Sequence, residues 1–230
     1  MKIAIIDCDR LDKNIVTFFG NYGDMIYGNL FKDNPNVKVC FFNAIEQKLP
    51  DENNFDAAII SGSKSDSFSK IPWIITLRDW CKQTSLPIVG ICFGHQVLAL
   101  AHDGQVSRAP RWGAGHKRFS VVEDRPWMDV YEQKLSMMVM HQDQVTALPP
   151  HAIHTLEANH CKIFGFEVPD RCITFQGHPE YEAGYMRLIL ERRRKQIGEK
   201  LSDQAIRNIL LPTSKKTIVN WICKFLKADL

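Results

Sequence analysis

The chain has 230 residues, of which 45% are hydrophobic and 24% are charged, and its formal net charge at pH 7 is +3. This composition is typical of an ordinary globular protein and excludes the collagen-like and disordered classes. The net charge is too small to indicate nucleic-acid binding. No uncharged apolar run approaches the ~20 residues that a membrane helix needs. We therefore expect neither nucleic acid nor a membrane as a partner.

The seven cysteines are odd in number and scattered, without a C-x-x-C pair, which is not a disulfide framework. The first residues, Met1 to Asp7, reach a charge too early for the core of a signal peptide. We therefore expect a cytoplasmic protein with free thiols. Histidines 151, 154 and 160 and the neighbouring Cys161 do not share one helix face, so we expect no metal, and no other cofactor.

In the first ninety residues, short apolar runs alternate with helical stretches. Runs of this length that are apolar on both sides are typical of buried parallel strands. Their alternation with helices predicts an α/β fold, with a doubly wound, mostly parallel sheet. The predicted strands are 3–6, 37–42, 57–60 and 87–91, and the predicted helices are 22–31 and 71–83.

From about residue 119 the pattern changes to closely spaced strand candidates joined by turns. We predict that strands 119–122, 136–140, 154–158, 162–167 and 172–175 form an antiparallel extension of the same sheet, followed by helices 182–196 and 217–226. The basic run 192–195 is expected to lie in solvent near the end of a helix, where the dipole favours cations. No linker or repeat divides the chain, so we expect one domain over 1–230, with a core of about 1–185 and a helical extension of about 186–230.

The segment Gly90-Ile91-Cys92-Phe93-Gly94 joins a predicted buried strand to an amphipathic helix, 96–101. Its G-x-C-x-G spacing is that of a nucleophile elbow, a turn so tight that its flanking residues must lack side chains while the thiol projects. The helix N-terminus favours a thiolate, and the N–H of Phe93 is free to donate into an oxyanion hole. The alternative is that Cys92 is a small core residue beside structural glycines.

A second motif, Gly177-His178-Pro179-Glu180, follows the last predicted strand. Histidine is well suited to take a thiol proton near neutral pH. Glu180 can hold the imidazole in one tautomer and stabilise its cation. The alternative is a turn that leads into a helix. Together, the two motifs predict a triad of Cys92, His178 and Glu180.

The two motifs together resemble the signature of the class I glutamine amidotransferase family, in its GMP-synthetase-like branch, whose stand-alone members include the plant γ-glutamyl peptidases. The resemblance extends to about Tyr185 and implies a flavodoxin-like class I amidotransferase fold. It also implies that Gly62, in Ser61-Gly62-Ser63, supplies an oxyanion donor beside Phe93. The substrate contacts that it implies are Gln96, His141, Gln142 and Asp143.

The function implied by this resemblance is hydrolysis of a γ-glutamyl amide bond, in glutamine or in a γ-glutamyl peptide or amine, through a γ-glutamyl thioester. The expected partner is a small-molecule γ-glutamyl substrate, without a cofactor. A second hypothesis is a glutaminase subunit that delivers ammonia to a separate synthase. A third is a non-enzymatic, DJ-1-like protein, against which the His178-Pro179-Glu180 segment argues.

Overall fold

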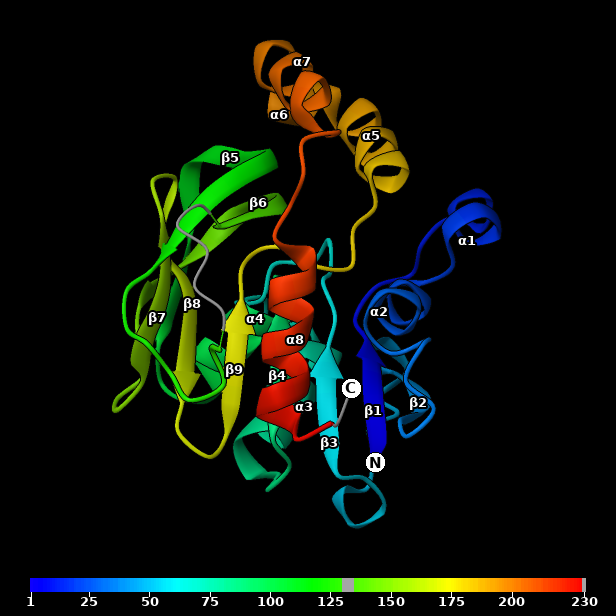
Figure 1. The fold of residues 1–230 in the computed structure, drawn as a ribbon, viewed down its shortest axis with the longest axis vertical. Coiled ribbons are helices and arrows are strands. Elements are labelled where there is room, and N and C mark those ends of the chain that lie inside the picture. Colours follow the sequence, from blue (N-terminus) through cyan, green and yellow to red (C-terminus); the bar gives the residue numbers. More distant parts are fainter. Residues whose placement is uncertain (130–134, 229–230) are drawn as a thin grey trace.

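Nine strands within residues 1–129 and 135–228, the part of the chain that the computed structural model describes, form one sheet. Its order is β2-β1-β3-β4-β9-β8-β7-β5-β6 (Figure 1). The strands are β1 (Lys2–Asp7), β2 (Lys38–Asn43), β3 (Ala57–Ile60), β4 (Ile88–Ile91), β5 (Gln105–Val121), β6 (Leu135–Ala147), β7 (Ile153–Ala158), β8 (Cys161–Val168) and β9 (Cys172–Phe175).

The parallel part of the sheet includes β9, which the sequence analysis had placed in the antiparallel extension. β2, β1, β3 and β4 are parallel, as predicted, but β9 also pairs parallel with β4, while it pairs antiparallel with β8. The assignment of 172–175 to the antiparallel extension is therefore wrong on one side of the strand. All four residues of β9 are buried, as in a central strand with apolar neighbours on both faces. The C-terminal ends of β4 and β9 consequently lie side by side.

Helices cover both faces of the parallel strands, as expected for a doubly wound sheet. Ile3 and Ile5 point into a core that includes residues of α2 and α8, whereas Ala4 and Ile6 point into a core with α3 and α4. The helices are α1 (Lys13–Phe19), α2 (Tyr22–Leu30), α3 (Pro72–Gln83), α4 (Phe93–Ala101), α5 (Ala183–Arg192), α6 (Arg194–Ile197), α7 (Glu199–Asn208) and α8 (Lys215–Leu226), with short 3₁₀ turns at Ala44–Glu46 and Glu52–Asn54. None of the helices in the described residues is long and apolar enough to span a bilayer.

The antiparallel strands β5 and β6 are much longer than the predicted strands 119–122 and 136–140. Residues 105–113 of β5 are mostly exposed and include a proline, so this stretch lacks a clear apolar period. The pairing with β6 also shifts register between Arg108 and Gly113, as at a β-bulge, which bends a strand. The two strands extend to the end of the sheet where β4 and β9 terminate (Figure 1).

The C-terminal helices fall into two groups. α5, α6 and α7 lie beyond the C-terminal ends of the parallel strands, and α8 returns across one sheet face (Figure 1). The predicted helix 182–196 is interrupted at Arg193, and α7 was not predicted. In α8, Ile218, Trp221 and Ile222 are fully buried in the same core as Phe175.

The turn from β4 into α4 is packed too tightly for side chains at its flanking glycines. A Cβ on Gly94 would lie 2.5 Å from the carbonyl oxygen of Ile60, and one on Gly90 would lie 2.8 Å from the Gly94 backbone. Real Cβ atoms do not approach backbone atoms this closely, so the turn excludes any larger residue at either position. The steric requirement inferred from the G-x-C-x-G spacing is present in the structure.

We expect Gly94→Ala to lower the free energy of unfolding by about 1–3 kcal/mol, because the added methyl must displace the β3 backbone. Gly28→Ala is the matched control, since a Cβ there meets nothing within 4 Å. In the α2 helix, that change should be neutral or stabilising by up to about 1 kcal/mol. Urea unfolding of both variants measures the difference, and equal stabilities would contradict the packing described for the turn.

Candidate active site

Cys92 occupies the turn between β4 and α4 with a strained backbone, φ 52° and ψ −96°. A non-glycine residue in a sparsely populated region of this kind costs about 1–3 kcal/mol and persists only where its surroundings enforce it. Here the Cys92 N–H donates to the carbonyl oxygen of Phe175, the last residue of β9, at 2.8 Å. Cys92 is 5% exposed and directly precedes α4, so its thiol lies at the positive end of the helix dipole.

His178 reaches the same point from the loop that follows β9. Its backbone N–H donates to the carbonyl oxygen of Met138 in β6 at 2.8 Å, which fixes the loop. A Cβ on Gly62 would lie 3.0 Å from Cε1 of His178 and 3.9 Å from Cβ of Cys92. Both side chains therefore converge on Gly62, where β3 ends. The structure brings together residues that are more than eighty positions apart in the sequence.

Glu180 holds the His178 ring from the side away from Cys92. Its Oε1 lies 2.7 Å from Nδ1 of His178, and both side chains are buried. The second ring nitrogen, Nε2, has no hydrogen-bond partner within residues 1–129 and 135–228. Burial by itself lowers the pKa of His178, but the negative charges of Glu180 and of the Cys92 thiolate outweigh burial and raise it above its ordinary value. The site therefore favours an imidazolium with Nε2 available.

Tyr181 stacks on one face of the His178 ring, a contact that the sequence did not predict. Its ring lies parallel to the His178 ring, with an interplanar angle of 9° and centroids 3.8 Å apart. Burial raises the pKa of Tyr181 well above its ordinary value, so its ring is neutral and can stabilise a cation over its face. Its hydroxyl and that of Tyr185 both bond to the hydroxyl of Tyr22, at 3.3 and 3.1 Å. The only sequence signal was an aromatic residue directly after the His-Pro-Glu segment.

The two predicted oxyanion donors lie beside Cys92: Phe93 follows it in the chain, and a Cβ on Gly62 would lie 3.9 Å from its Cβ. In the described part of the chain, neither the N–H of Gly62 nor that of Phe93 donates a hydrogen bond. The Gly62 loop is held by Ser61, whose hydroxyl accepts from the N–H of Cys8 at 2.9 Å and donates to the Gly62 carbonyl oxygen at 2.9 Å. These free N–H groups beside a thiol are the arrangement that an oxyanion hole requires.

Gln96 and Gln176 form a buried amide chain behind the thiol. Nε2 of Gln96 donates to the Asp143 carbonyl oxygen at 2.9 Å and to Oε1 of Gln176 at 3.2 Å. Nε2 of Gln176 in turn lies 3.5 Å from Sγ of Cys92. The amide nitrogen of Gln96 is therefore occupied within the protein, which leaves its Oε1 for a ligand. Sequence reasoning missed Gln176, which directly follows β9 and precedes His178 by two residues.

The predicted substrate contacts His141, Gln142 and Asp143 all line one cavity with Cys92. His141 is neutral, because burial, followed by the charge of His160, lowers its pKa well below the ordinary value. Both its ring nitrogens are occupied, by the Asp143 carbonyl oxygen at 3.1 Å and by Nε2 of His160 at 3.2 Å. His141 thus supports the wall of the cavity. The Gln142 amide bonds to the Ala109 carbonyl oxygen at 3.0 Å.

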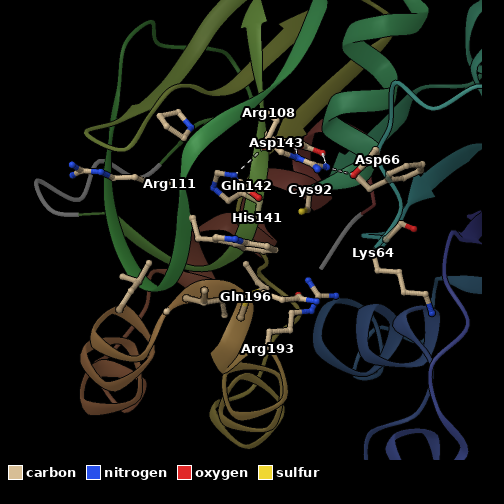
Figure 2. Close-up of a pocket in the computed structure, with 18 of the residues that line it drawn as sticks. Lys64, Asp66, Cys92, Arg108, Arg111, His141, Gln142, Asp143, Arg193 and Gln196 are labelled. Carbon is tan, nitrogen blue, oxygen red and sulfur yellow. Dashed lines mark hydrogen bonds and ion pairs between the residues drawn. The ribbon is translucent and has the colours of Figure 1, made fainter.

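The cavity has a volume of about 1150 Å³ and opens at the ends of the parallel strands. Figure 2 shows Cys92 in its centre, with Asp66, Arg108 and Asp143 on one side and Arg193 and Gln196 on the other. Arg108 bridges two carboxylates on its side, bonding to Asp143 at 2.9 Å and also to Asp66. The opposite wall comes from the segment between α5 and α7, which sequence reasoning did not connect with the site.

Within residues 1–129 and 135–228, the other cysteine and histidine side chains form no metal-binding cluster. All seven cysteines are free. Within the described ranges, no three or more His, Cys, Asp or Glu side chains gather in an arrangement that could hold a metal ion. Of the histidines weighed as a metal cluster, His160 pairs with His141 and His154 bonds to backbone carbonyl oxygens.

Both the sequence and the fold are similar to those of known amidotransferases. The family model for class I glutamine amidotransferases matches residues 15–193. Gamma-glutamyl peptidase 2 of Arabidopsis thaliana is 32% identical over 202 residues, 81% of this chain and 80% of that protein. One subunit of the glutamine-hydrolysing GMP synthase of Methanosarcina acetivorans is 32% identical over 103 residues, 44% of this chain and 54% of its own length.

The solved structure of a glutamine amidotransferase from Thermotoga maritima has the same fold. Its TM-score is 0.79 at 15% sequence identity, over 98% of this chain and 99% of the other. At this identity the likeness shows the fold alone. It confirms the predicted α/β fold with a mostly parallel sheet and an antiparallel extension.

The ion pair between His178 and Glu180 predicts a measurable shift in the pKa of His178 when Glu180 is changed. Glu180→Gln removes the negative charge next to the imidazole and should lower the pKa of His178. Because the folded-state pKa is above the unfolded value of about 6.5, the stability contributed by the imidazolium is present below that pH and is lost as pH rises through the raised pKa. In the variant this stability contribution should be smaller, and its loss should be complete at a lower pH than in wild type.

An NMR titration of the imidazole protons follows both proteins. His95 is the internal control, because burial lowers its pKa to about 3 and its ring contacts Thr174 rather than Glu180. An unchanged pKa of His178 in Glu180→Gln would contradict the electrostatic assignment.

Proposed function

Because the chain belongs to the class I glutamine amidotransferase family, we propose that it is a stand-alone cysteine hydrolase of γ-glutamyl amide bonds. Cys92 is the nucleophile, His178 the general acid and base, and Glu180 the residue that orients His178. The observation that carries the proposal is the convergence of Cys92 and His178 on Gly62, with Glu180 bonded to the far side of the imidazole at 2.7 Å. The reducing cytoplasm is the compartment that suits an enzyme with free thiols.

The reaction proceeds in two displacements. The Cys92 thiolate forms an Sγ–C bond to the γ-carbonyl carbon, and the N–H groups of Gly62 and Phe93 stabilise the oxygen as it becomes negative. The C–N bond then breaks, and the His178 imidazolium transfers its proton from Nε2 to the departing nitrogen. Water, deprotonated by His178, attacks the γ-glutamyl thioester. This step releases glutamate and returns the proton to the thiol.

The environment of His178 supports its two roles. Glu180 binds Nδ1 and so directs Nε2 toward Cys92, as the third member of a triad does. Tyr181 covers one face of the ring and excludes water from it. The raised pKa keeps the imidazole charged until the leaving group needs a proton. The same features argue against the non-enzymatic hypothesis, because a sensing thiol requires neither a buried base nor a carboxylate behind it.

A second candidate is a glutaminase subunit that delivers ammonia to a separate synthase. It is favoured by the similarity to one subunit of a GMP synthase, although this covers 44% of the chain. The two candidates differ in behaviour: the hydrolase cleaves its substrate when purified alone, whereas a glutaminase of this kind should be nearly idle on glutamine until its synthase is added. We favour the hydrolase because the similarity to a γ-glutamyl peptidase extends over 81% of the chain.

The proposal is tested by Cys92→Ala in a mass-spectrometric screen of γ-glutamyl peptides, amines and glutamine. We expect wild type to release glutamate from at least one compound and Cys92→Ala to lose at least about 10³-fold in turnover, because the nucleophile is gone. Circular dichroism and thermal melting check that the variant is folded. Cys40→Ala is the control, since Cys40 is a half-buried thiol in the edge strand β2, and it should retain full turnover. Undiminished turnover by Cys92→Ala would sink the assignment.

A further inference from the structure

The basic run Arg192-Arg193-Arg194-Lys195 does not behave as one solvated patch. Arg192 forms an ion pair with Asp12, and Arg194 forms one with Asp203 at 2.7 Å. Arg193 lies between them at the break that separates α5 from α6, with φ −97° and ψ 10°. The break turns its side chain toward the cavity, while its neighbours pair outside it. Its placement differs from the solvent-exposed position predicted for the whole run.

The backbone at Arg193 is fixed on both sides. Its N–H donates to the Ile189 carbonyl oxygen at 3.0 Å, and its own carbonyl oxygen accepts from the N–H groups of Gln196 and Ile197, each at 2.9 Å. The side chain is half-buried and, within the ranges that the structure covers, has no hydrogen-bond or ion-pair partner. A guanidinium in this state presents five N–H donors in a rigid fork that suits a carboxylate.

The other cations that line the cavity are less suited to bind a ligand next to Cys92. Lys64 pairs with Asp9 at 3.1 Å, and Arg108 is shared by Asp66 and Asp143. Arg111 points away from Cys92 (Figure 2), and Lys200 is exposed.

Arg193 also lies on the side of the thiol where the leaving group must be. It lines the large cavity together with Cys92, and it lines a small recess of about 10 Å³ together with His178, Tyr181 and Cys92. His178 has to pass its proton to the departing nitrogen, so that nitrogen lies against the recess. The predicted contacts of the γ-glutamyl half, which include Gln96 and Asp143, also line the large cavity, so we place that half of the substrate toward them.

We propose that Arg193 binds a carboxylate of the departing amine, so that the enzyme prefers γ-glutamyl amino acids and peptides with a free carboxylate near the scissile bond over glutamine and neutral γ-glutamyl amides. The inference rests on the proposed hydrolase function and adds a specificity-determining residue to it. It also gives the C-terminal extension a role, because α5 and α6 place a charge that the minimal sheet does not supply.

The test compares two substrates that differ in one charge, γ-glutamylglycine and γ-glutamylglycinamide. Wild type should cleave the acid with the higher kcat/KM, and Arg193→Gln should lower the ratio of acid to amide by about 10- to 100-fold, the range expected for loss of a hydrogen-bonded charge. Arg193→Lys should restore part of the ratio. Arg192→Gln is the matched control, because Arg192 pairs with Asp12 outside the cavity, and its ratio should equal that of wild type.

Two results would overturn the inference. One is an unchanged ratio in Arg193→Gln. The other is an equal loss on both substrates, which would assign Arg193 to the shared γ-glutamyl group or to the fold.

A binding measurement separates this inference from the proposed function. Calorimetric titration of Cys92→Ala and of Cys92→Ala/Arg193→Gln with the same two compounds requires no turnover. Selective loss of affinity for the acid in the double variant supports the role of Arg193 even if wild type proves unable to hydrolyse either compound. Equal affinities of both proteins for γ-glutamylglycine would refute that role even if hydrolysis by Cys92 is confirmed.

Discussion

The hydrogen bond between the Cys92 N–H and the Phe175 carbonyl oxygen, 2.8 Å long, is the contact on which the candidate site depends. It joins the ends of two parallel strands, β4 and β9, whose register runs from Ile88↔Cys172 to Ile91↔Phe175. Because the strands end together, the turn after β4 and the loop after β9 emerge at the same edge of the sheet. Cys92 and His178 meet for this reason, although a long antiparallel excursion separates them in the chain.

The same constraint explains how the strained turn persists. A positive φ at Cys92 is unfavourable for a residue with a side chain, by about 1–3 kcal/mol, and the surrounding packing has to enforce it. β3 enforces it from one side, where Gly94 lies against Ile60, and β9 from the other, through Phe175. The burial of Ile59, Ile91 and Phe175 in one core supplies the stability that offsets the strain. The chemistry of the thiol and the packing of the sheet are therefore inseparable.

Much of this arrangement was readable from local sequence. The strand 57–60 has the predicted bounds, and the helix predicted over 71–83 begins one residue later and ends at Gln83, because apolar runs and a proline in the first turn are strong local signals. The grouping of Cys92, His178 and Glu180 follows from two motifs whose spacing is chemically specific. The orientation of β9 was not readable, because a fully apolar four-residue strand suits a parallel or an antiparallel neighbour equally well.

Other features depend on tertiary contacts that leave no local pattern. The exposed first half of β5 lacks an apolar period, and the break at Arg193 occurs within a continuous run of good helix formers. Tyr181 belongs to the site only because its ring stacks on that of His178, a contact that no local sequence pattern indicates. The single domain over 1–230, with a core of about 1–185 and an extension of about 186–230, stays a prediction. This single-domain prediction is supported by Trp221 of α8, whose ring packs edge-on against that of Trp127 with the ring centroids 5.9 Å apart.

The central claim is that one of seven thiols is activated, and covalent trapping tests it most directly. The protein is incubated with a glutamine-shaped chloroketone or diazoketone, digested, and mapped by mass spectrometry for adducts on each cysteine. We expect a single adduct, on Cys92, with the other six thiols unmodified, because five of them are buried and the sixth, Cys40, lies in the edge strand β2, away from His178. No adduct at Cys92, or labelling of Cys40 at the same rate, would contradict the account.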